Sequence, residues 1–357
     1  MKARLGDYIR EYSVRNKVNE NIPVYSVTNS QGFCKDYFGK EVASKDKSTY
    51  KIVPKGCFAY NPSRINVGSV DWQRNEEKVI VSPLYNVFSV SPELDNQYLY
   101  YFLKSDIALW FIKSIATGSV RDNLKLSMLY EFPINLPNIE KQKEIVSTLD
   151  TLQSIITHRC TQLEKLDLLV KARFVEMFGD PITNSKNLET KNLKDVMVLK
   201  AGDFTAASDI SSEPTDKNIY PCFGGNGIRG YVSEYNQDGD FSLIGRQGAL
   251  SGNVQYARGK FKNTEHALLV TPTIEMNSIW LNQLLLNLDL KRYQTGAAQP
   301  GLSVKNLQEI PIIQVEIPEQ TQFADFVKQV DKSKATVQKA LDEAQLLFDS
   351  LMQEYFG

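Results

Sequence analysis

Cysteine and histidine are scarce in this chain of 357 residues, and their scarcity argues against several kinds of chemistry. The four cysteines lie far apart without a Cys-x-x-Cys pair, so the sequence predicts neither a zinc site nor a disulfide framework. A Ser-His-Asp triad would need one of the two histidines, His158 and His266, and neither has a recognisable catalytic context. We therefore expect no metal site and no catalytic residues.

Long apolar runs are also missing. No run approaches the roughly 18 residues that a membrane-spanning helix needs. The N-terminus lacks the charged-then-apolar pattern of a signal peptide. These absences predict a cytoplasmic protein with no membrane partner.

The chain has no excess of positive charge, since 41 basic residues face 42 acidic ones. A uniformly basic nucleic-acid-binding protein is therefore not expected, and any basic surface must be local. Residues 1–139 hold 18 basic and 14 acidic side chains, whereas residues 180–317 hold 13 and 15. The length favours two domains.

An internal repeat is the main positive feature of the sequence. Residues 117–179 can be laid on residues 295–357 without a gap, at a constant offset of 178. Gln142 then falls on Gln320, and the pair Phe178-Gly179 falls on Phe356-Gly357. The repeat predicts two copies of one unit, each a lobe followed by a long helix, related by a pseudo-twofold axis.

A glycine-rich stretch, GGNGIRG, contains the spacing of a dinucleotide-binding turn at Gly225, Gly227 and Gly230. The first-copy counterparts of the first two glycines are Val27 and Asn29, which cannot offer the same close backbone approach. A strand is expected next, at residues 231–235 and before a turn at 236–239, where that motif requires a helix. We interpret the stretch as a tight loop between strands.

Two long helices are predicted by apolar residues that alternate at spacings of four and three. Their simplest arrangement is an antiparallel coiled coil with each other, and the alternative is two ordinary core helices. Gly179 is expected to cap the first helix, with Pro181 after it. The residues predicted for the seam are Leu149, Ile156, Leu163, Val170, Val327, Leu341 and Phe348.

The fold class expected is α+β, with four segments along the chain. Lobe 1 (residues 1–139) and lobe 2 (residues 180–317) each combine short strands with one helix, near 97–114 and 278–293 respectively. The long helices are expected at residues 140–179 and 318–357.

Matching polar loops in the two lobes are the candidate binding elements. They cover residues 60–69 and 244–253, and each mixes one arginine with glycine and with amide or hydroxyl side chains. Arginine pairs with guanine and Asn or Gln with adenine, while small polar residues suit phosphates. A plain polar hairpin is the alternative. The candidates, with one from a later segment, are Tyr60, Asn61, Ser63, Arg64, Asn66, Ser69, Gly245, Arg246, Gln247 and Gln299.

Methyl transfer by this chain itself is not expected. Asn61-Pro62 matches the start of the N-P-P-[YF] motif of adenine methyltransferases, but Ser63 and Arg64 replace the second proline and the aromatic residue. The chain also lacks a credible glycine motif for S-adenosylmethionine.

The ordered set of segments resembles the DNA specificity subunit of Type I restriction-modification systems. The resemblance covers the whole chain and rests on residues 22–33 and 58–69 in lobe 1, and on residues 243–248 and 295–303 in lobe 2. Each lobe is followed by a glutamine-containing opening of a heptad helix. Lobe 1 departs after Thr117-Gly118, where it lacks the Gln-Pro-Gly-Leu found in lobe 2.

The resemblance implies that each lobe is a target recognition domain for one half of a bipartite, asymmetric site in double-stranded DNA. The paired helices would act as a spacer and as a dock for two methyltransferase subunits, and restriction subunits would join them. S-adenosylmethionine and ATP would then be bound by the partners, and this chain would hold no cofactor and catalyse no reaction. The alternatives are the specificity component of a related system with a fused methyltransferase-nuclease partner, and a two-lobed adaptor with no DNA role.

Overall fold

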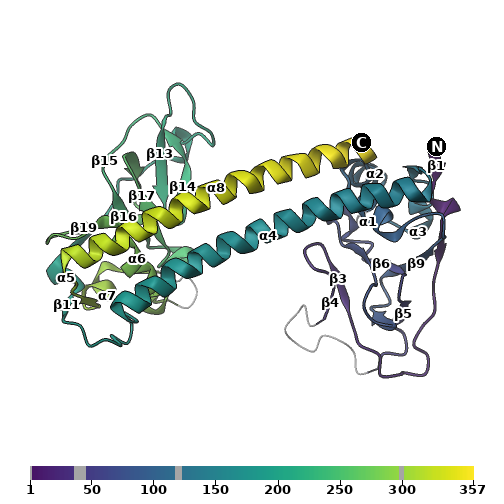
Figure 1. The fold of residues 1–357 in the computed structure, drawn as a ribbon, viewed down its shortest axis with the longest axis horizontal. Helices are drawn as coiled ribbons and strands as arrows, with labels where there is room; N and C mark the ends of the chain where they lie inside the picture. Colours follow the sequence, from purple (N-terminus) through teal and green to yellow (C-terminus); the bar gives the residue numbers. More distant parts are fainter. Residues whose placement is uncertain (1, 36–45, 117–122, 297–300) are drawn as a thin grey trace. The chain divides into compact units, whose positions relative to one another are not determined.

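The computed structural model describes residues 2–35, 46–116, 123–296 and 301–357 and divides the chain into two units. Unit 1 contains residues 1–159 and 339–357, and unit 2 contains residues 160–338. Two helices of 40 residues, α4 (Ile139–Phe178) and α8 (Ile317–Phe356), contribute to both units (Figure 1). Each begins and ends within one residue of the range expected from the sequence.

The centre of unit 1 is a four-stranded antiparallel sheet with the order β2-β9-β6-β7. Its strands are β2 (Ile9–Glu11), β6 (Phe58–Tyr60), β7 (Val70–Trp72) and β9 (Asn86–Val90). Phe58 and Phe88 stack across neighbouring strands with ring centroids 5.1 Å apart. Helices α1 (Asn96–Lys104) and α2 (Asp106–Ala116) add buried side chains to the same core.

The remaining strands of unit 1 form antiparallel pairs. They are β1 (Lys2–Arg4) with β10 (Pro133–Asn135), β3 (Ser26–Thr28) with β4 (Gly32–Cys34), and β5 (Lys51–Pro54) with β8 (Lys78–Val81). Short helices cover η1 (Leu5–Asp7), η2 (Ile65–Val67) and α3 (Leu126–Leu129).

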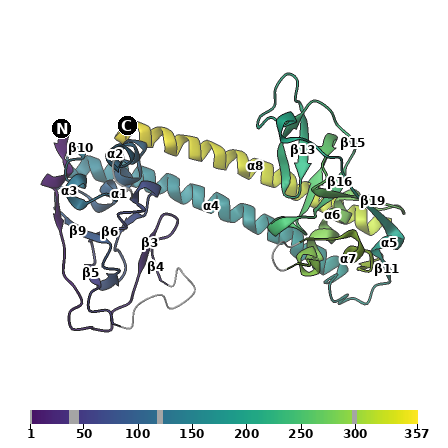
Figure 2. The same ribbon diagram turned by 180° about the vertical axis from the view of Figure 1, so that it is seen from behind.

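Unit 2 is built around a sheet of the same design, with the order β12-β19-β16-β17 and every pair antiparallel. Its strands are β12 (Met197–Ala201), β16 (Phe241–Gly245), β17 (Val254–Ala257) and β19 (Ala267–Pro272). A second sheet has the order β14-β13-β18-β15, with β13 (Tyr220–Gly224), β14 (Gly227–Val232), β15 (Gln237–Asp238) and β18 (Lys260–Asn263) (Figure 2).

The other elements of unit 2 are short. They are the pair β11 (Thr190–Asn192) with β20 (Pro311–Ile313), the helices α5 (Leu193–Val196), α6 (Ser278–Asn287) and α7 (Val304–Gln308), and the 3-10 turns η3 (Ala207–Asp209), η4 (Gly248–Leu250) and η5 (Leu290–Tyr293). The shared sheet order, together with the β1–β10 and β11–β20 pairs, confirms the internal repeat.

Within each unit the two long helices pack with the start of one beside the end of the other. In unit 1, Ile145 and Leu149 of α4 share a core with Phe356 of α8. In unit 2, Phe174 of α4 meets Phe323 of α8 with ring centroids 5.5 Å apart. The expected antiparallel arrangement is confirmed. Leu149, Ile156, Val170 and Val327 are buried, whereas Leu163, Leu341 and Phe348 are half-buried.

Two equivalent glutamines fasten each lobe to its long helix. Gln142 is buried, and its Oε1 accepts a hydrogen bond of 2.8 Å from the backbone N–H of Asp95, the residue that caps α1. Gln320 is also buried, and its Oε1 accepts one of 2.8 Å from the N–H of Asn277, which caps α6. The glutamine repeated at the start of both long helices is therefore an anchor.

The predicted end of the first long helix is confirmed. Gly179 has a φ of 78°, and its N–H bonds the carbonyl of Val175 at 2.8 Å. Glycine adopts this left-handed conformation without strain, which suits it to close a helix.

The helix expected over each lobe is broken in both. In lobe 1, Ser105 is extended (ψ 155°) and separates α1 from α2, and its hydroxyl donates to the carbonyl of Phe102 at 2.7 Å. In lobe 2, α6 ends at Asn287, and Asp289 takes a φ of 46° before the turn η5. Apolar periodicity continued through both breaks, which is why the sequence suggested single helices.

The glycine-rich stretch forms a hairpin, as interpreted from the sequence. Strands β13 and β14 flank a two-residue turn at Gly225 and Asn226. The strand after the turn spans Gly227–Val232, so the range 231–235 was wrong, and residues 237–238 form β15 within the expected turn. A side chain at Gly230 would meet the carbonyl oxygen of Ser211 at 2.3 Å, so this glycine serves close packing of strands. In the described part of the chain no helix is long and apolar enough to cross a membrane.

Candidate nucleic-acid interface

The first candidate loop, residues 60–69, connects β6 to β7. The Asn61 side chain organises its start, because Oδ1 accepts a hydrogen bond of 3.0 Å from the N–H of Ser63. The turn η2 follows, and Gly68 closes the loop with a φ of 83°. Short-range bonds of this kind hold a polar loop in one conformation.

The second candidate loop, residues 244–253, connects β16 to β17, the corresponding strands of lobe 2. It also contains a 3-10 turn, η4, and it closes through a hydrogen bond of 2.7 Å from the N–H of Gly252 to the carbonyl of Gly245. The two loops therefore join equivalent strands, as the sequence comparison predicted.

Each loop accepts a backbone hydrogen bond from a leucine at an equivalent position of its lobe. In lobe 1 the N–H of Leu124 bonds the carbonyl of Pro62 at 3.2 Å, and in lobe 2 the N–H of Leu302 bonds the carbonyl of Arg246 at 2.9 Å. Both leucines are buried and stand 178 residues apart. This contact makes Pro62 the counterpart of Arg246. Arg64 lies two residues further along its loop, so the two arginines do not occupy equivalent positions.

Three candidate residues are corrected by their burial. The Tyr60 hydroxyl donates to the carbonyl of Leu124 at 3.1 Å and accepts from Asn86 at 2.8 Å, and burial raises the pKa of this phenol. Ser69 is buried at the start of β7. Gly245 is buried as well, and a side chain there would meet the Gly225 carbonyl oxygen at 2.2 Å. The side chains of Tyr60 and Ser69 and the backbone of Gly245 are thus buried beside the loops.

The other candidates divide by exposure. Ser63, Arg64 and Gln247 are exposed, and Asn61, Asn66 and Arg246 are half-buried. Within the described residues the guanidinium of Arg64 has no hydrogen bond or ion pair, whereas that of Arg246 contacts the Glu265 carbonyl at 3.5 Å. Gln299 lies outside the described residues, although its neighbour Gly301 bridges to Gln247.

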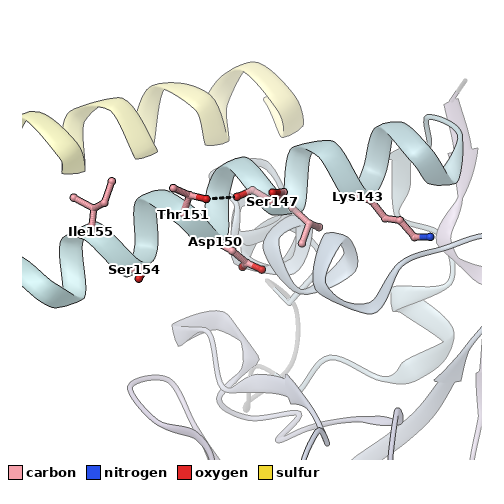
Figure 3. Close-up of a pocket in the computed structure, with 7 residues that line it drawn as sticks. Lys143, Ser147, Asp150, Thr151, Ser154 and Ile155 are labelled. Atoms are coloured by element: carbon pink, nitrogen blue, oxygen red, sulfur yellow. Dashed lines mark hydrogen bonds between the residues drawn. The ribbon is translucent and has the colours of Figure 1, made fainter.

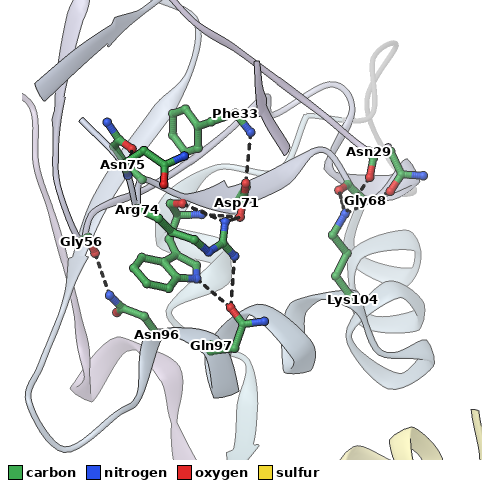
Figure 4. Close-up of polar contacts among 12 residues, drawn as sticks. Asn29, Phe33, Gly56, Gly68, Asp71, Arg74, Asn75, Asn96, Gln97 and Lys104 are labelled. Atoms are coloured by element: carbon green, nitrogen blue, oxygen red, sulfur yellow. Dashed lines mark hydrogen bonds and ion pairs between the residues drawn. The ribbon is translucent and has the colours of Figure 1, made fainter. Parts of the chain in front are cut away.

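In lobe 1 the tip of the β3–β4 hairpin is attached to the candidate loop by Lys104. Its Nζ donates to Asn29 Oδ1 at 3.0 Å and to the carbonyl of Gly68 (Figure 4). Burial lowers the pKa of this ammonium, which Asp71 partly opposes. No motif pointed to Lys104, which ends α1 far from both partners in sequence.

A second network extends from the same hairpin to the long helix, and Figure 4 shows its part from Phe33 to Gln97. Asp71 accepts a hydrogen bond of 3.1 Å from the N–H of Phe33 and pairs with Arg74 at 2.8 Å. Arg74 donates to Gln97 Oε1 at 3.1 Å, and the Gln97 amide donates to Asp150 of α4 at 3.2 Å. The hairpin is thus coupled through side chains to α4 within unit 1.

In lobe 2 the equivalent hairpin is attached by a pair of amides, since Asn253 Nδ2 donates to Asn226 Oδ1 at 2.6 Å. The turn before β19 adds two residues that no motif singled out. His266 Nδ1 lies 3.0 Å from Gln247 Oε1, and its Nε2 lies 3.1 Å from Glu265 Oε1. Glu265 and His266 lie outside the loop in sequence, so the sequence analysis did not predict that they contact it.

A shallow hollow of about 630 Å³ runs along α4 in unit 1 (Figure 3). Its lining is Lys143, Val146, Ser147, Asp150, Thr151, Ser154 and Ile155. Three of these seven side chains carry hydroxyl groups, and Thr151 uses its own to bond the Ser147 carbonyl at 2.7 Å. Among the residues that the structure describes, no cluster of His, Cys, Asp and Glu side chains could hold a metal ion.

Comparison with known proteins identifies the repeated architecture. The family model described as the Type I restriction modification DNA specificity domain matches twice, at residues 6–167 and 185–345. The EcoprrI specificity subunit of the Type I restriction enzyme of Escherichia coli is 35% identical over 248 residues, covering 66% of this chain and 61% of that protein. The MjaIX specificity subunit of Methanocaldococcus jannaschii is 28% identical over 43% of this chain and 38% of its own length. The chain thus spans less than two thirds of these relatives.

Solved structures share the fold across the whole chain. The S subunit of a Type-I restriction-modification system from M. genitalium superposes with a TM-score of 0.62 at 17% identity, covering 100% of this chain and 96% of that one. A chain from a structure of complex assembly and conformational transition in the type I R-M system gives 0.59 at 19% identity, with coverage of 100% and 97%. With both halves matched by one family model, the chain belongs to the Type I restriction modification DNA specificity family.

Proposed function

We propose that this chain is the sequence-specific DNA-binding component of a Type I restriction-modification complex, with each lobe reading one half of a bipartite, asymmetric site. The observation that carries the proposal is the repetition of one polar loop, between equivalent strands and above an equivalent leucine, in both lobes. Two similar but non-identical readers on one chain suit a site whose halves differ.

The exposed loop side chains supply the chemistry for reading DNA. Arg64 is free within the described residues to form a bidentate pair with guanine, and Gln247 offers the amide that pairs with adenine. Ser63 and Asn66 suit phosphate or sugar contacts, which set the position of a protein on the duplex without reading sequence. The residues of lobe 1 and lobe 2 therefore predict different base preferences.

We propose that the long helices dock two methyltransferase subunits. Leu168 and Leu169 are exposed on α4 within unit 2, and Leu346 and Leu347, which stand 178 residues later, are exposed on α8 within unit 1. Adjacent leucines left in water on equivalent helix faces favour covering by a partner. One such pair in each unit supports two copies of the same subunit.

The chemistry is assigned to the partners. The methyltransferase subunits would bind S-adenosylmethionine and methylate adenine, and restriction subunits would use ATP to translocate and cut unmodified DNA. This chain would contribute recognition and the spacing between half-sites, and it would bind no cofactor.

Mapping methylated adenines in the native genome, with this chain present and with it deleted, tests the proposal. We expect one bipartite motif to be methylated only when the chain is present. If the motif persists in the deletion strain, or if the chain with its co-purified partner protects no DNA sequence, the DNA role is wrong and a two-lobed adaptor is the better description. Co-purification of one fused methyltransferase-nuclease in place of separate subunits would assign the chain to the related system.

A further inference from the structure

Three segments of lobe 2 that are distant in sequence converge at the candidate loop. The β13–β14 turn arrives through Asn226, which bonds Asn253, and the segment near Gly301 bridges to Gln247. The turn before β19 brings Glu265 and His266, whose carbonyl accepts a hydrogen bond of 3.1 Å from the Arg246 N–H. Gln247 and His266 are thus held side by side at the edge of the lobe.

The imidazole of His266 faces an oxygen atom at each of its two nitrogens. Nε2 lies 3.1 Å from Glu265 Oε1, and Nδ1 lies 3.0 Å from Gln247 Oε1. A carboxylate can only accept, and a neutral imidazole has one N–H. Both contacts are hydrogen bonds only when the ring carries a proton on each nitrogen.

Loss of one proton has a defined consequence. Glu265 keeps the remaining hydrogen on Nε2, so Nδ1 becomes an acceptor and repels Gln247 Oε1. The Gln247 side chain is exposed, and turning its terminal amide over restores the bond with the NH₂ group as donor. The group that Gln247 then presents away from His266 changes from the NH₂ donor to the carbonyl acceptor.

Several charged groups lie around Glu265, the carboxylate that contacts the His266 ring. Glu265 Oε2 is buried without a hydrogen-bond partner in the described structure, so the adjacent ring is the side chain that balances this carboxylate. Arg246 contacts the Glu265 carbonyl, and at the thiol of Cys222 the charges of Arg229 of β14 and Lys262 of β18 oppose that of Glu265. Glu265 is the charged side chain in contact with the ring, where its carboxylate accepts the hydrogen of Nε2.

We propose that Glu265 and His266 determine the specificity of lobe 2 by setting which face of the Gln247 amide meets a base. With the ring doubly protonated, Gln247 offers a donor, which guanine, thymine and the N7 of adenine can accept in the major groove and cytosine cannot. With the ring neutral, Gln247 offers an acceptor and favours adenine or cytosine, which present amino groups. Gln247 reads the base, and the other two are positioning residues. The inference rests on the proposed DNA role.

Equilibrium binding of the complex with its methyltransferase subunits to duplexes substituted at every position of both half-sites tests the inference. We expect one position of the lobe 2 half-site to change its preferred base between an acidic and an alkaline buffer, compared at about pH 6 and about pH 8. The change in relative affinity should be about 5- to 100-fold, the discrimination typical of one good side-chain pair. Lobe 1 positions, read without a histidine, should not change.

Variants separate the roles. Glu265→Gln removes the carboxylate that fixes the hydrogen on Nε2 and should abolish the pH dependence, and His266→Gln should abolish it as well. Gln247→Met should remove discrimination at that position and serves as the second test if the other variants fold poorly. His158→Gln, at the other histidine and in unit 1, is the matched control and should behave as the parent protein.

Two failures remain distinct. Absence of sequence-specific binding at any position would reject the proposed function itself. Specific binding whose lobe 2 preference is the same at both pH values, or a pH dependence that survives His266→Gln, would overturn this inference and leave the proposed function standing.

Discussion

In unit 1 the tip of the β3–β4 hairpin is held to the candidate loop by the ammonium of Lys104, whereas in unit 2 the tip of β13–β14 is held by the amide of Asn253. The sheet order, the supporting leucine and the anchoring glutamine are the same in both. The framework has therefore been kept while the parts around the loops have diverged. Under the proposed function, this separation would allow the specificity of each lobe to change without disturbing the scaffold.

Substitutions in the packed seam of the long helices should have the largest effect on stability, and the effect should be similar in both units. Leu149→Glu and Val327→Glu replace equivalent buried residues, and each buries an unpaired charge, which costs about 3–5 kcal/mol. Limited proteolysis should show cleavage in unit 1 for the first variant and in unit 2 for the second. Leu163→Glu and Leu341→Glu, at half-buried positions, are the matched controls and should cost less. Equal protection of all four would show that these stripes are not packed seams.

The exposed leucine pairs test whether each unit binds its own methyltransferase copy. Replacing Leu168 and Leu169 together by serine should release one methyltransferase copy, because burying a leucine contributes about 1.5–3 kcal/mol. The same change at Leu346 and Leu347 should release the other copy. Native mass spectrometry of the complex measures the stoichiometry. Retention of two copies in both variants would place the docking surface elsewhere.

Substitution of the two anchoring glutamines tests whether the two units lose a similar free energy of unfolding. Gln142→Ala and Gln320→Ala each leave the N–H of a helix cap without its acceptor, at a cost of about 1–3 kcal/mol. Denaturant unfolding should show similar losses for the two variants, each confined to its own unit. A large effect in only one unit would mean that the anchors have diverged as the loops have.

The exposed Arg64 and the half-buried Arg246 should each affect binding to a different half-site. Arg64→Ala should weaken binding to one half-site by about 1–3 kcal/mol, as expected for a lost base contact, and Arg246→Ala should affect the other. Competition binding with single-base variants of both half-sites measures each effect. A loss spread evenly over all sequences would indicate a phosphate contact.

The smallest expected difference concerns the hairpin attachments themselves. Lys104→Ala removes hydrogen bonds from a charged donor, worth about 1.5–3 kcal/mol, whereas Asn253→Ala removes a neutral one, worth about 0.5–1.5 kcal/mol. Hydrogen exchange at the two hairpin tips should rise more in the first variant. The reverse order would show that the Asn253 amide carries more of the attachment than its chemistry suggests.

The sequence was sufficient for the parts of the molecule that obey a simple period. The gapless offset through Gln142 and Gln320 predicted the repeat, and the spacing through Leu149 and Val327 predicted the long helices. Their antiparallel arrangement was predicted from the pseudo-twofold relation of the two copies. The sequence could not predict the helix break at Ser105, because a serine inside an apolar pattern is compatible with a continuous helix.

The candidate site was predicted only in outline, and the reason is spatial. Tyr60 adjoins a polar loop in sequence, yet its side chain turns into the core, which a single sequence cannot reveal. Glu265, His266 and Lys104 reach the loops only through sheet pairing and helix packing. Lone residues at such distances carry no pattern that sequence analysis could detect.

Unit 1 is assembled from residues 1–159 and 339–357, while unit 2 is continuous. On the ribosome, residues of the first block such as Tyr98 must wait for Phe356, against which Tyr98 packs with ring centroids 5.0 Å apart. At synthesis rates of about 5–20 residues per second, roughly 200 further residues take about 10–40 s. During that interval the nascent chain can complete unit 2 while the aromatic surface of unit 1 stays uncovered. Translation speed, and chaperones that bind the emerging first block, should therefore influence the yield of this protein more than that of one built from two continuous domains.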